Sequence, residues 1–333
     1  MKKQLKNIDI VLQPKLGDSI LSLPGIICLK QLIDKYDSGN IKVRIISTNK
    51  LTKVFKSFEI AEVKELSFFS KIQSQLFPAD KVFFLATSSK NMMYKGTETF
   101  GQVMNYKKHI KYDYNLPCLS FKETDELLPA ELINFLKTEY KLSTISISIF
   151  GICLELGYTA EQIISTFKFD KNSLIPKCNF TKWTPDFDKY AVFCLEAANN
   201  RRNDADRRWS EESYLEIAEY IYKKYSLTSV FIGTNNKSTI PSKAYFIDLR
   251  KKLDLVNLTQ LLKCSIGYIG NDTGPLHIAN LMQKKSVGIY LREASTIDYS
   301  PLFPELNTII IKPENTDIVY PAVDELCSAV FAR

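Results

Sequence analysis

The stretch from Tyr268 to Met282, Y-I-G-N-D-T-G-P-L-H-I-A-N-L-M, constrains the fold more than any other part of the chain. The residues before it alternate like the end of a buried strand, and Gly270 to Gly274 form a cluster of turn residues. Pro275 suits the first turn of a helix, where its missing N–H needs no partner. We expect the Thr273 hydroxyl to cap this helix. The stretch therefore predicts a strand, a tight turn and a helix.

This junction has a chemical consequence. Free backbone N–H groups and the positive end of the helix dipole point out of the strand's carboxyl end, where a phosphate can bind. Ligands of open α/β sheets bind at that same edge. Taken alone, however, such a turn is more often a capped structural junction without a ligand. A second element elsewhere in the chain is needed to favour a binding site.

Predicted strands and helices alternate through the chain. In the second half, strands are expected at 190–197, 229–233, 244–248, 265–269, 286–290 and 308–311, with helices at 211–225, 254–263 and 317–331. In the first half, strands are expected at 8–12, 41–47, 58–66, 82–86 and 109–114, a long loop at 88–108 and a helix at 131–142. Residues 143–150 alternate as a strand would. The pattern predicts mainly parallel sheets with helices on both faces.

The length of 333 residues favours two domains, at roughly 150 residues each. We expect a first Rossmann-like domain at 1–168, a linker at 169–185, a second Rossmann-like domain at 186–316 and a closing helix at 317–333. Two such doubly wound domains facing each other would enclose a central cleft.

The first strand leads into a turn that parallels the late one. It reads K-L-G-D-S-I-L, in which Gly17 supplies the turn and Asp18 or Ser19 can cap the following helix. Asp18 therefore stands at a strand-to-helix edge. On its own, an N-cap is the simpler interpretation of this residue. In the two-domain arrangement, Asp18 would enter the cleft from one side and the start of the late helix from the other.

Composition narrows the functional classes. The chain is 45% hydrophobic and 24% charged, as ordinary soluble proteins are. We find no run of about 18 apolar residues and no signal-peptide pattern, so we expect a cytoplasmic location. The net charge of +7 suits an anionic ligand or contact with an anionic membrane surface, and equally a solvated lysine-rich surface. We expect no nucleic-acid partner.

Metal, cofactor and nucleotide-triphosphate motifs are missing from the sequence. Its seven cysteines form no C-x-x-C pair, and the two histidines, His109 and His277, are too few for a histidine-rich metal site. There is no G-x-x-x-x-G-K-[ST] motif, no G-x-G-x-x-G after the first strand and no G-x-S-x-G. We therefore expect neither a metal nor a cofactor.

Three elements together resemble one family. K-L-G-D-S-I-L-S-L-P near the start, Arg207-Arg208-Trp209 in the middle and G-N-D-T-G-P-L-H-I-A-N-L late in the chain are similar to glycosyltransferase family 9, the ADP-heptose:lipopolysaccharide heptosyltransferases. Their order and spacing match over nearly the whole chain. The resemblance implies a GT-B fold and an inverting, metal-independent transfer of a sugar from a nucleotide sugar to lipopolysaccharide core or another surface glycan. It also favours a helix at 143–157 in place of the strand.

The resemblance also implies roles for individual residues. Asp18, after Gly17, matches the catalytic base that takes the proton of the acceptor hydroxyl. Arg207 stands where the family usually has a lysine for the donor phosphates, and arginine keeps the charge while adding a bidentate fork. The D-T-G-x-x-H signature, which binds the diphosphate, corresponds to Asp272, Thr273, Gly274 and His277, and we expect Gly17 to take part in donor binding as well. A solvated basic loop at Arg207 and a core histidine at His277 are the structural alternatives.

Two loops depart from the family pattern. After the strand at 229–233 the sequence reads G-T-N-N-K-S in place of G-x-x-x-E, and after the strand at 286–290 it reads L-R-E-A-S-T in place of a loop like F-G-P-T. Both loops adjoin the nucleotide, so the donor base and sugar stay open. A catalytically silent nucleotide-sugar-binding module of the same fold and a sugar-nucleotide epimerase remain alternatives to the transferase.

Overall fold

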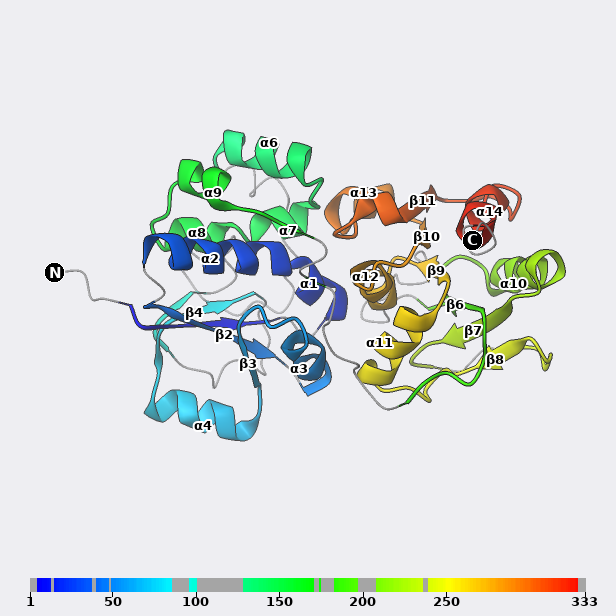
Figure 1. The fold of residues 1–333 in the computed structure, drawn as a ribbon, viewed down its shortest axis with the longest axis horizontal. Helices are drawn as coiled ribbons and strands as arrows, with labels where there is room; N and C mark the ends of the chain where they lie inside the picture. Colours follow the sequence, from blue (N-terminus) through cyan, green and yellow to red (C-terminus); the bar gives the residue numbers. More distant parts are fainter. Residues whose placement is uncertain are drawn as a thin grey trace. The chain divides into compact units, whose positions relative to one another are not determined.

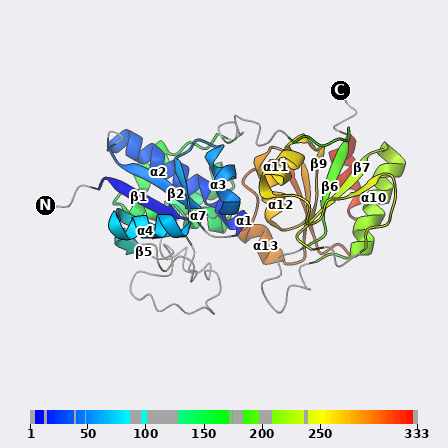
Figure 2. The same ribbon diagram turned by 90° about the horizontal axis from the view of Figure 1, so that it is seen from below.

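The chain divides into two compact units, Met1–Ser173 and Leu174–Arg333, each built on a parallel β-sheet (Figures 1 and 2). The computed structural model describes residues 5–12, 15–37, 40–47, 49–85, 96–100, 128–170, 174, 183–196, 208–235 and 239–328. Each unit is considered by itself.

The first unit has a five-stranded sheet in the order β3-β2-β1-β4-β5, with every pair parallel. Its strands are β1 (Asn7–Val11), β2 (Lys42–Ser47), β3 (Glu62–Glu65), β4 (Ala79–Phe84) and β5 (Gly96–Phe100). Its helices are α1 (Leu16–Leu21), α2 (Leu23–Tyr36), α3 (Asn49–Lys56), α4 (Phe68–Leu76), α6 (Ala130–Glu139), α7 (Thr144–Ser148), α8 (Gly151–Glu155) and α9 (Ala160–Thr166). Because helices cover both faces, the central strands β1, β2 and β4 are mostly buried and largely apolar.

One charged pair interrupts this apolar sheet. Asp9, the acidic residue within β1, is buried and accepts two hydrogen bonds from the guanidinium of Arg44 on β2, at 2.5 and 2.9 Å. The two residues are direct partners in the parallel register. A buried carboxylate needs such a bidentate partner to offset the loss of water.

Two of the expected elements in this unit are wrong. Residues 96–100 form strand β5, where a long loop was expected. Residues 143–150 are helical through α7 rather than a strand, and α7 with α8 confirms the helix that the family resemblance favoured at 143–157. The alternating serines there do not face solvent, because the Ser148 hydroxyl donates to Ile145 O at 2.7 Å and Ser143 caps the helix through Ser146 N. Hydroxyls satisfied locally can be buried in a helix. The strand expected at 109–114 lies outside the described residues.

A continuous helical stretch, Leu16–Tyr36, is long and apolar enough to cross a membrane by length and composition. It is 72% buried within the protein, as the core helix of a globular unit would be. A second candidate needs α7–α8 and α9 to count as one span despite a bend of 117°. Among the described residues these are the only such stretches, and packing inside the first unit accounts for the long one.

The second unit has a six-stranded sheet in the order β11-β10-β9-β6-β7-β8, again all parallel. Its strands are β6 (Tyr190–Cys194), β7 (Thr228–Ile232), β8 (Phe246–Asp248), β9 (Gly267–Asn271), β10 (Ser286–Tyr290) and β11 (Asn307–Ile311). Its helices are α10 (Glu211–Tyr225), α11 (Leu255–Cys264), α12 (Gly274–Leu281), α13 (Glu293–Asp298) and α14 (Tyr320–Ser328). The order reverses between β6 and β9, so the ends of these strands form a topological switch point.

The prediction of doubly wound α/β sheets is confirmed in both units. Two helices of the second unit begin at capping side chains. Ser210 caps α10 and Asp254 caps α11, and each side chain accepts a hydrogen bond from the backbone N–H three residues later.

Candidate functional site

The turn between β9 and α12 lies at the switch point of the second sheet. Asn271, the last residue of β9, is fully buried and ties this turn to its neighbours. Its side-chain amide donates to Leu195 O at 3.0 Å, and its side-chain oxygen accepts from Trp209 N at 3.2 Å. The Trp209 indole in turn donates to Pro313 O at 3.2 Å. Asn271 therefore connects the chain just after β6, at Leu195, with Trp209, two residues before α10, at the turn that leads into α12.

Gly270 allows this close packing. A Cβ placed there would lie 2.5 Å from the Tyr268 hydroxyl and 2.6 Å from Cys194 O, both shorter than side chains tolerate. The Tyr268 hydroxyl uses the space to reach Thr273 Oγ1 and Asn271 O, each at 3.2 Å. The buried Tyr268 side chain thus fixes the backbone of the turn.

Thr273 is the N-cap residue of α12, but its hydroxyl does not cap the helix, and this expectation was wrong. The hydroxyl turns back to Asn271 O at 3.2 Å and to Tyr268. No described residue accepts a hydrogen bond from the backbone N–H groups of Thr273 and Gly274. Those donors, with the positive end of the helix dipole, are therefore left for a ligand.

Asp272 and His277 lie together beside this turn. Both are buried, and His277 Nε2 lies 3.8 Å from Asp272 Oδ1, an electrostatic rather than a hydrogen-bonding distance. Burial lowers the pKa of His277 to about 4, so its imidazole is neutral near pH 7. Its Nδ1 has no hydrogen-bond partner among the described residues. Burial first, and the Asp272 carboxylate second, raise the pKa of Tyr290 on β10.

The buried imidazole predicts a pH-dependent stability. The pKa of His277 in the folded protein lies below its usual 6.5, so the unfolded chain takes up the proton first as the pH falls. Stability therefore falls below pH 6.5. We expect His277 to cost about 2 kcal/mol of unfolding free energy between pH 7 and about pH 5. Urea unfolding of the wild type and His277→Gln across this range measures it, and parallel profiles would contradict it.

Asp18 and Gly17 lie in the first unit, at the start of α1. Lys15 is the N-cap residue, so the expectation that Asp18 or Ser19 caps this helix was wrong. Asp18 is instead the third helical residue, with a side chain 10% exposed and an oxygen 3.9 Å from Lys15 Nζ. Its carboxylate stands over the first turn, where a negative charge is favoured. Arg207, the predicted phosphate-binding residue, lies outside the described residues.

Sequence reasoning missed one carboxylate at the edge of the second sheet. Glu196, just after β6, accepts from Thr234 N, Thr234 Oγ1 and Asn235 N at 2.8, 2.8 and 2.7 Å. A Cβ on Gly233 would lie 2.4 Å from Glu196 Oε1, so any larger residue there would displace the Glu196 carboxylate. Glu196 therefore fixes the turn after β7, one of the two loops that depart from the family pattern. A contact across two strands leaves no local signal in the sequence.

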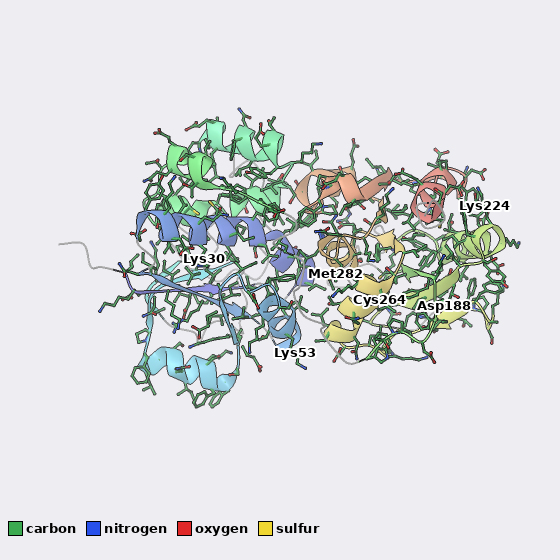
Figure 3. The ribbon with its side chains drawn as sticks, in the orientation of Figure 1. Lys30, Lys53, Asp188, Lys224, Cys264 and Met282 are labelled. Carbon is green, nitrogen blue, oxygen red and sulfur yellow. The ribbon has the colours of Figure 1, made fainter. Side chains whose placement is uncertain are left out.

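The four signature residues Asp272, Thr273, Gly274 and His277 are thus gathered at one strand-to-helix turn. Figure 3 labels Met282, the residue that follows α12, and Cys264, which ends α11 and is exposed. Within the described ranges, no three His, Cys, Asp or Glu side chains gather as a metal site requires.

Comparison with known proteins identifies one matching family. A family model described as glycosyltransferase family 9 (heptosyltransferase) matches residues 145–322. A search of curated proteins finds no match. Among solved structures, E. coli ADP-heptose LPS heptosyltransferase II is similar at 12% identity and a TM-score of 0.62, covering 97% of this chain and 99% of that one.

Two further solved structures are similar to this chain over nearly its whole length. The family 9 glycosyltransferase of Veillonella parvula DSM 2008 is 15% identical with a TM-score of 0.62, covering 99% of both chains. E. coli heptosyltransferase WaaC with ADP is 14% identical with a TM-score of 0.60, covering 96% of this chain and 99% of that one. At these identities the likeness shows the fold, which is the predicted GT-B class.

Proposed function

Because the chain belongs to glycosyltransferase family 9, we propose that it transfers a sugar from a nucleoside-diphosphate donor to lipopolysaccharide core or another surface glycan. The transfer proceeds with inversion and without a metal. The turn from Asn271 to Gly274 is the observation that carries this proposal. It presents the N–H groups of Thr273 and Gly274 at the carboxyl edge of a parallel sheet, where a diphosphate is the fitting ligand.

The proposed mechanism is a single displacement at the anomeric carbon of the donor sugar. The acceptor hydroxyl oxygen attacks the anomeric carbon while the bond from that carbon to the diphosphate oxygen breaks on the opposite face. Asp18 takes the proton of the attacking hydroxyl. A single displacement of this kind inverts the anomeric configuration. The proposal assigns the first unit to the acceptor and the second to the donor.

Negative charge grows on the departing nucleoside diphosphate. The proposal assigns its stabilisation to the start of α12, to the N–H groups of Thr273 and Gly274 and to the Arg207 guanidinium. His277 is neutral near pH 7 because of its burial. It therefore adds an imidazole N–H as a donor rather than a second full charge. The Asp272 carboxylate lies 3.8 Å from that ring, beyond hydrogen-bonding distance.

The donor is proposed only as a nucleoside-diphosphate sugar, heptose or another. WaaC of E. coli has been solved with ADP and with ADP-2-deoxy-2-fluoro heptose, and those ligands belong to that protein. In the present chain, Glu196 accepts hydrogen bonds from Thr234 N and Asn235 N, and the proposal puts this turn beside the nucleotide. The loops at 233–238 and 291–296 also depart from the family pattern.

We further propose that the enzyme works in the cytoplasm at the inner membrane.

A thermal-shift panel of ADP, GDP, UDP, CDP and dTDP tests donor binding. The matching nucleotide is expected to raise the melting temperature most, since ligand at about 100 times its Kd adds about 2.7 kcal/mol of stability. The corresponding nucleotide sugars are then incubated with acceptor glycan, with and without EDTA. An inverted linkage formed equally fast with EDTA supports the proposal.

Three results would oppose the proposal, each in its own way. Binding without turnover on any acceptor would indicate a silent module. A changed but free nucleotide sugar would indicate an epimerase. No change in melting temperature with any nucleotide would contradict the proposal that this turn binds the donor.

A further inference from the structure

The turn that follows β7 presents two successive backbone N–H groups, and a carboxylate of the chain itself already occupies them. Thr234 N donates to Glu196 Oε2 at 2.8 Å, and Asn235 N donates to Glu196 Oε1 at 2.7 Å. The Thr234 hydroxyl donates to Oε2 as well, at 2.8 Å. Successive N–H groups in a turn form a concavity that binds anions. The Glu196 carboxylate therefore fills the position that a free anion would otherwise take.

Packing and charge hold this carboxylate in place. Gly233 has no side chain where the carboxylate passes, since a Cβ there would lie 2.7 Å from Glu196 Cδ. Gly233 O accepts from Lys251 N at 2.8 Å, which ties the turn to the residues after β8. The buried Arg250 has a raised pKa, first because of its hydrogen bonds with Asp248 and further because of nearby carboxylates that include Glu196. The guanidinium in turn stabilises the ionised carboxylate of Glu196.

A second pair of N–H groups lies at the same edge of the sheet. These belong to Thr273 and Gly274, and no described residue accepts a hydrogen bond from them. β7 and β9 flank β6 in the second sheet, so their carboxyl ends are about 10 Å apart (Figure 1). Of these two pairs, only the one at the start of α12 can receive an anion.

We propose that Glu196 is a specificity-determining residue, which excludes phosphate from the turn after β7 and thereby fixes the direction in which the donor lies. Because the carboxylate repels a second anion, the diphosphate binds at the start of α12. The nucleoside, which carries no charge, then lies along the turn from Gly233 to Asn235. This inference rests on the proposed function, since it orients the nucleoside-diphosphate donor of that reaction.

An amide chemical-shift titration of the isotope-labelled full chain tests the exclusion, with inorganic pyrophosphate as the probe. In the wild type, pyrophosphate is expected to shift the amide signals of Thr273 and Gly274 and to leave those of Thr234 and Asn235 unchanged. Glu196→Ala removes the carboxylate, so pyrophosphate is expected to shift all four. Its affinity for the turn after β7 should rise at least about tenfold over the wild type, because two N–H groups become open to an anion.

The nucleoside diphosphate identified by thermal shift tests the direction. In the wild type it is expected to shift the amides of Thr234 and Asn235 together with those of Thr273 and Gly274, because its nucleoside lies along the turn after β7. Pyrophosphate, which has no nucleoside, shifts only the second pair. The difference between the two probes therefore reports where the nucleoside binds.

Gly233→Ala is a second route to the open turn. The added Cβ displaces the carboxylate, so pyrophosphate is again expected to shift the two amides of this turn. Glu325→Ala is the matched control. It removes an exposed carboxylate, paired with Lys285 at 3.1 Å, and raises the net charge by one as Glu196→Ala does. Pyrophosphate should shift the same amides in this control as in the wild type.

Four outcomes would overturn the inference. Pyrophosphate shifts the amides of Thr234 and Asn235 in the wild type, so the carboxylate does not exclude it. Neither variant of the turn gains those shifts, which leaves Glu196 a purely structural role. The Glu325→Ala control gains them, so they follow net charge. The nucleoside diphosphate leaves them unchanged in the wild type. A wild type in which pyrophosphate shifts neither Thr273 nor Gly274 would instead contradict the proposed donor site, which distinguishes the two failures.

Discussion

Asp18→Asn is expected to lower the turnover number for sugar transfer by about 10²- to 10⁴-fold, the usual contribution of a general base. Asparagine has nearly the same size and still accepts a hydrogen bond, but it cannot take up a proton at neutral pH. The KM for the nucleotide sugar should change little, because Asp18 is assigned to the acceptor and not to the donor. Steady-state kinetics with the donor identified by thermal shift would measure both constants.

Asp34→Asn is the matched control for this substitution. Asp34 lies on the same helical stretch, on α2, and is exposed in an i,i+4 ion pair with Lys30 at 3.0 Å. Removing such a pair costs at most about 1 kcal/mol, and transfer should proceed at the wild-type rate. Asp18→Asn retaining more than about a tenth of the wild-type turnover number would remove Asp18 from the role of base.

The sheets could be predicted because their physical signal is local. Strands buried on both faces are largely apolar. β6 is apolar along its whole length, and β1, β2 and β9 are apolar apart from a few polar positions such as Asp9, Arg44 and Asn271. The N-cap residues Ser210 and Asp254 mark where two helices begin, and this signal is also local. Each makes its hydrogen bond to a residue three positions along the chain.

The failures share a different cause. Alternation at 143–150 looks like a strand, yet the serines hydrogen-bond within the helix and are buried with their neighbours. Helix α4 escaped prediction because its outward face is apolar, so the usual rule of apolar residues facing inward does not apply. In both segments, tertiary surroundings decide what the side chains face, and a single sequence does not contain those surroundings.

The features of the candidate site also fall into two groups, those with a local signal in the sequence and those set by tertiary contacts. Asp272, Thr273, Gly274 and His277 could be predicted as a group because they share one turn. The direction of the Thr273 hydroxyl could not be predicted, because it depends on a contact with the buried Tyr268 side chain. The contacts of Glu196 with Thr234 and of Asn271 with Trp209 join residues 38 and 62 positions apart. No spacing in the sequence signals such contacts.

Asn271→Ala is the second large effect expected, and it acts on stability and donor binding together. The substitution leaves Trp209 N and Leu195 O buried without their partner, which is expected to cost roughly 3 kcal/mol of unfolding free energy. It also releases the backbone that aims the N–H groups of Thr273 and Gly274. Affinity for the matching nucleoside diphosphate should therefore fall at least tenfold, about 1.4 kcal/mol. Urea unfolding and calorimetric titration measure the two effects.

Asn280→Ala separates the loss of stability from the loss of binding. Asn280 is 1% exposed and makes the same pair of contacts, donating to Phe303 O at 2.7 Å and accepting from Phe303 N at 2.9 Å. Its removal should cost about as much stability, again roughly 3 kcal/mol, because the buried groups left behind are the same. Asn280 lies one residue before the end of α12 and does not hold the turn, so nucleotide affinity should persist. Equal losses of affinity in both variants would show that binding follows general stability, and the Asn271 turn would lose its special part in holding the donor.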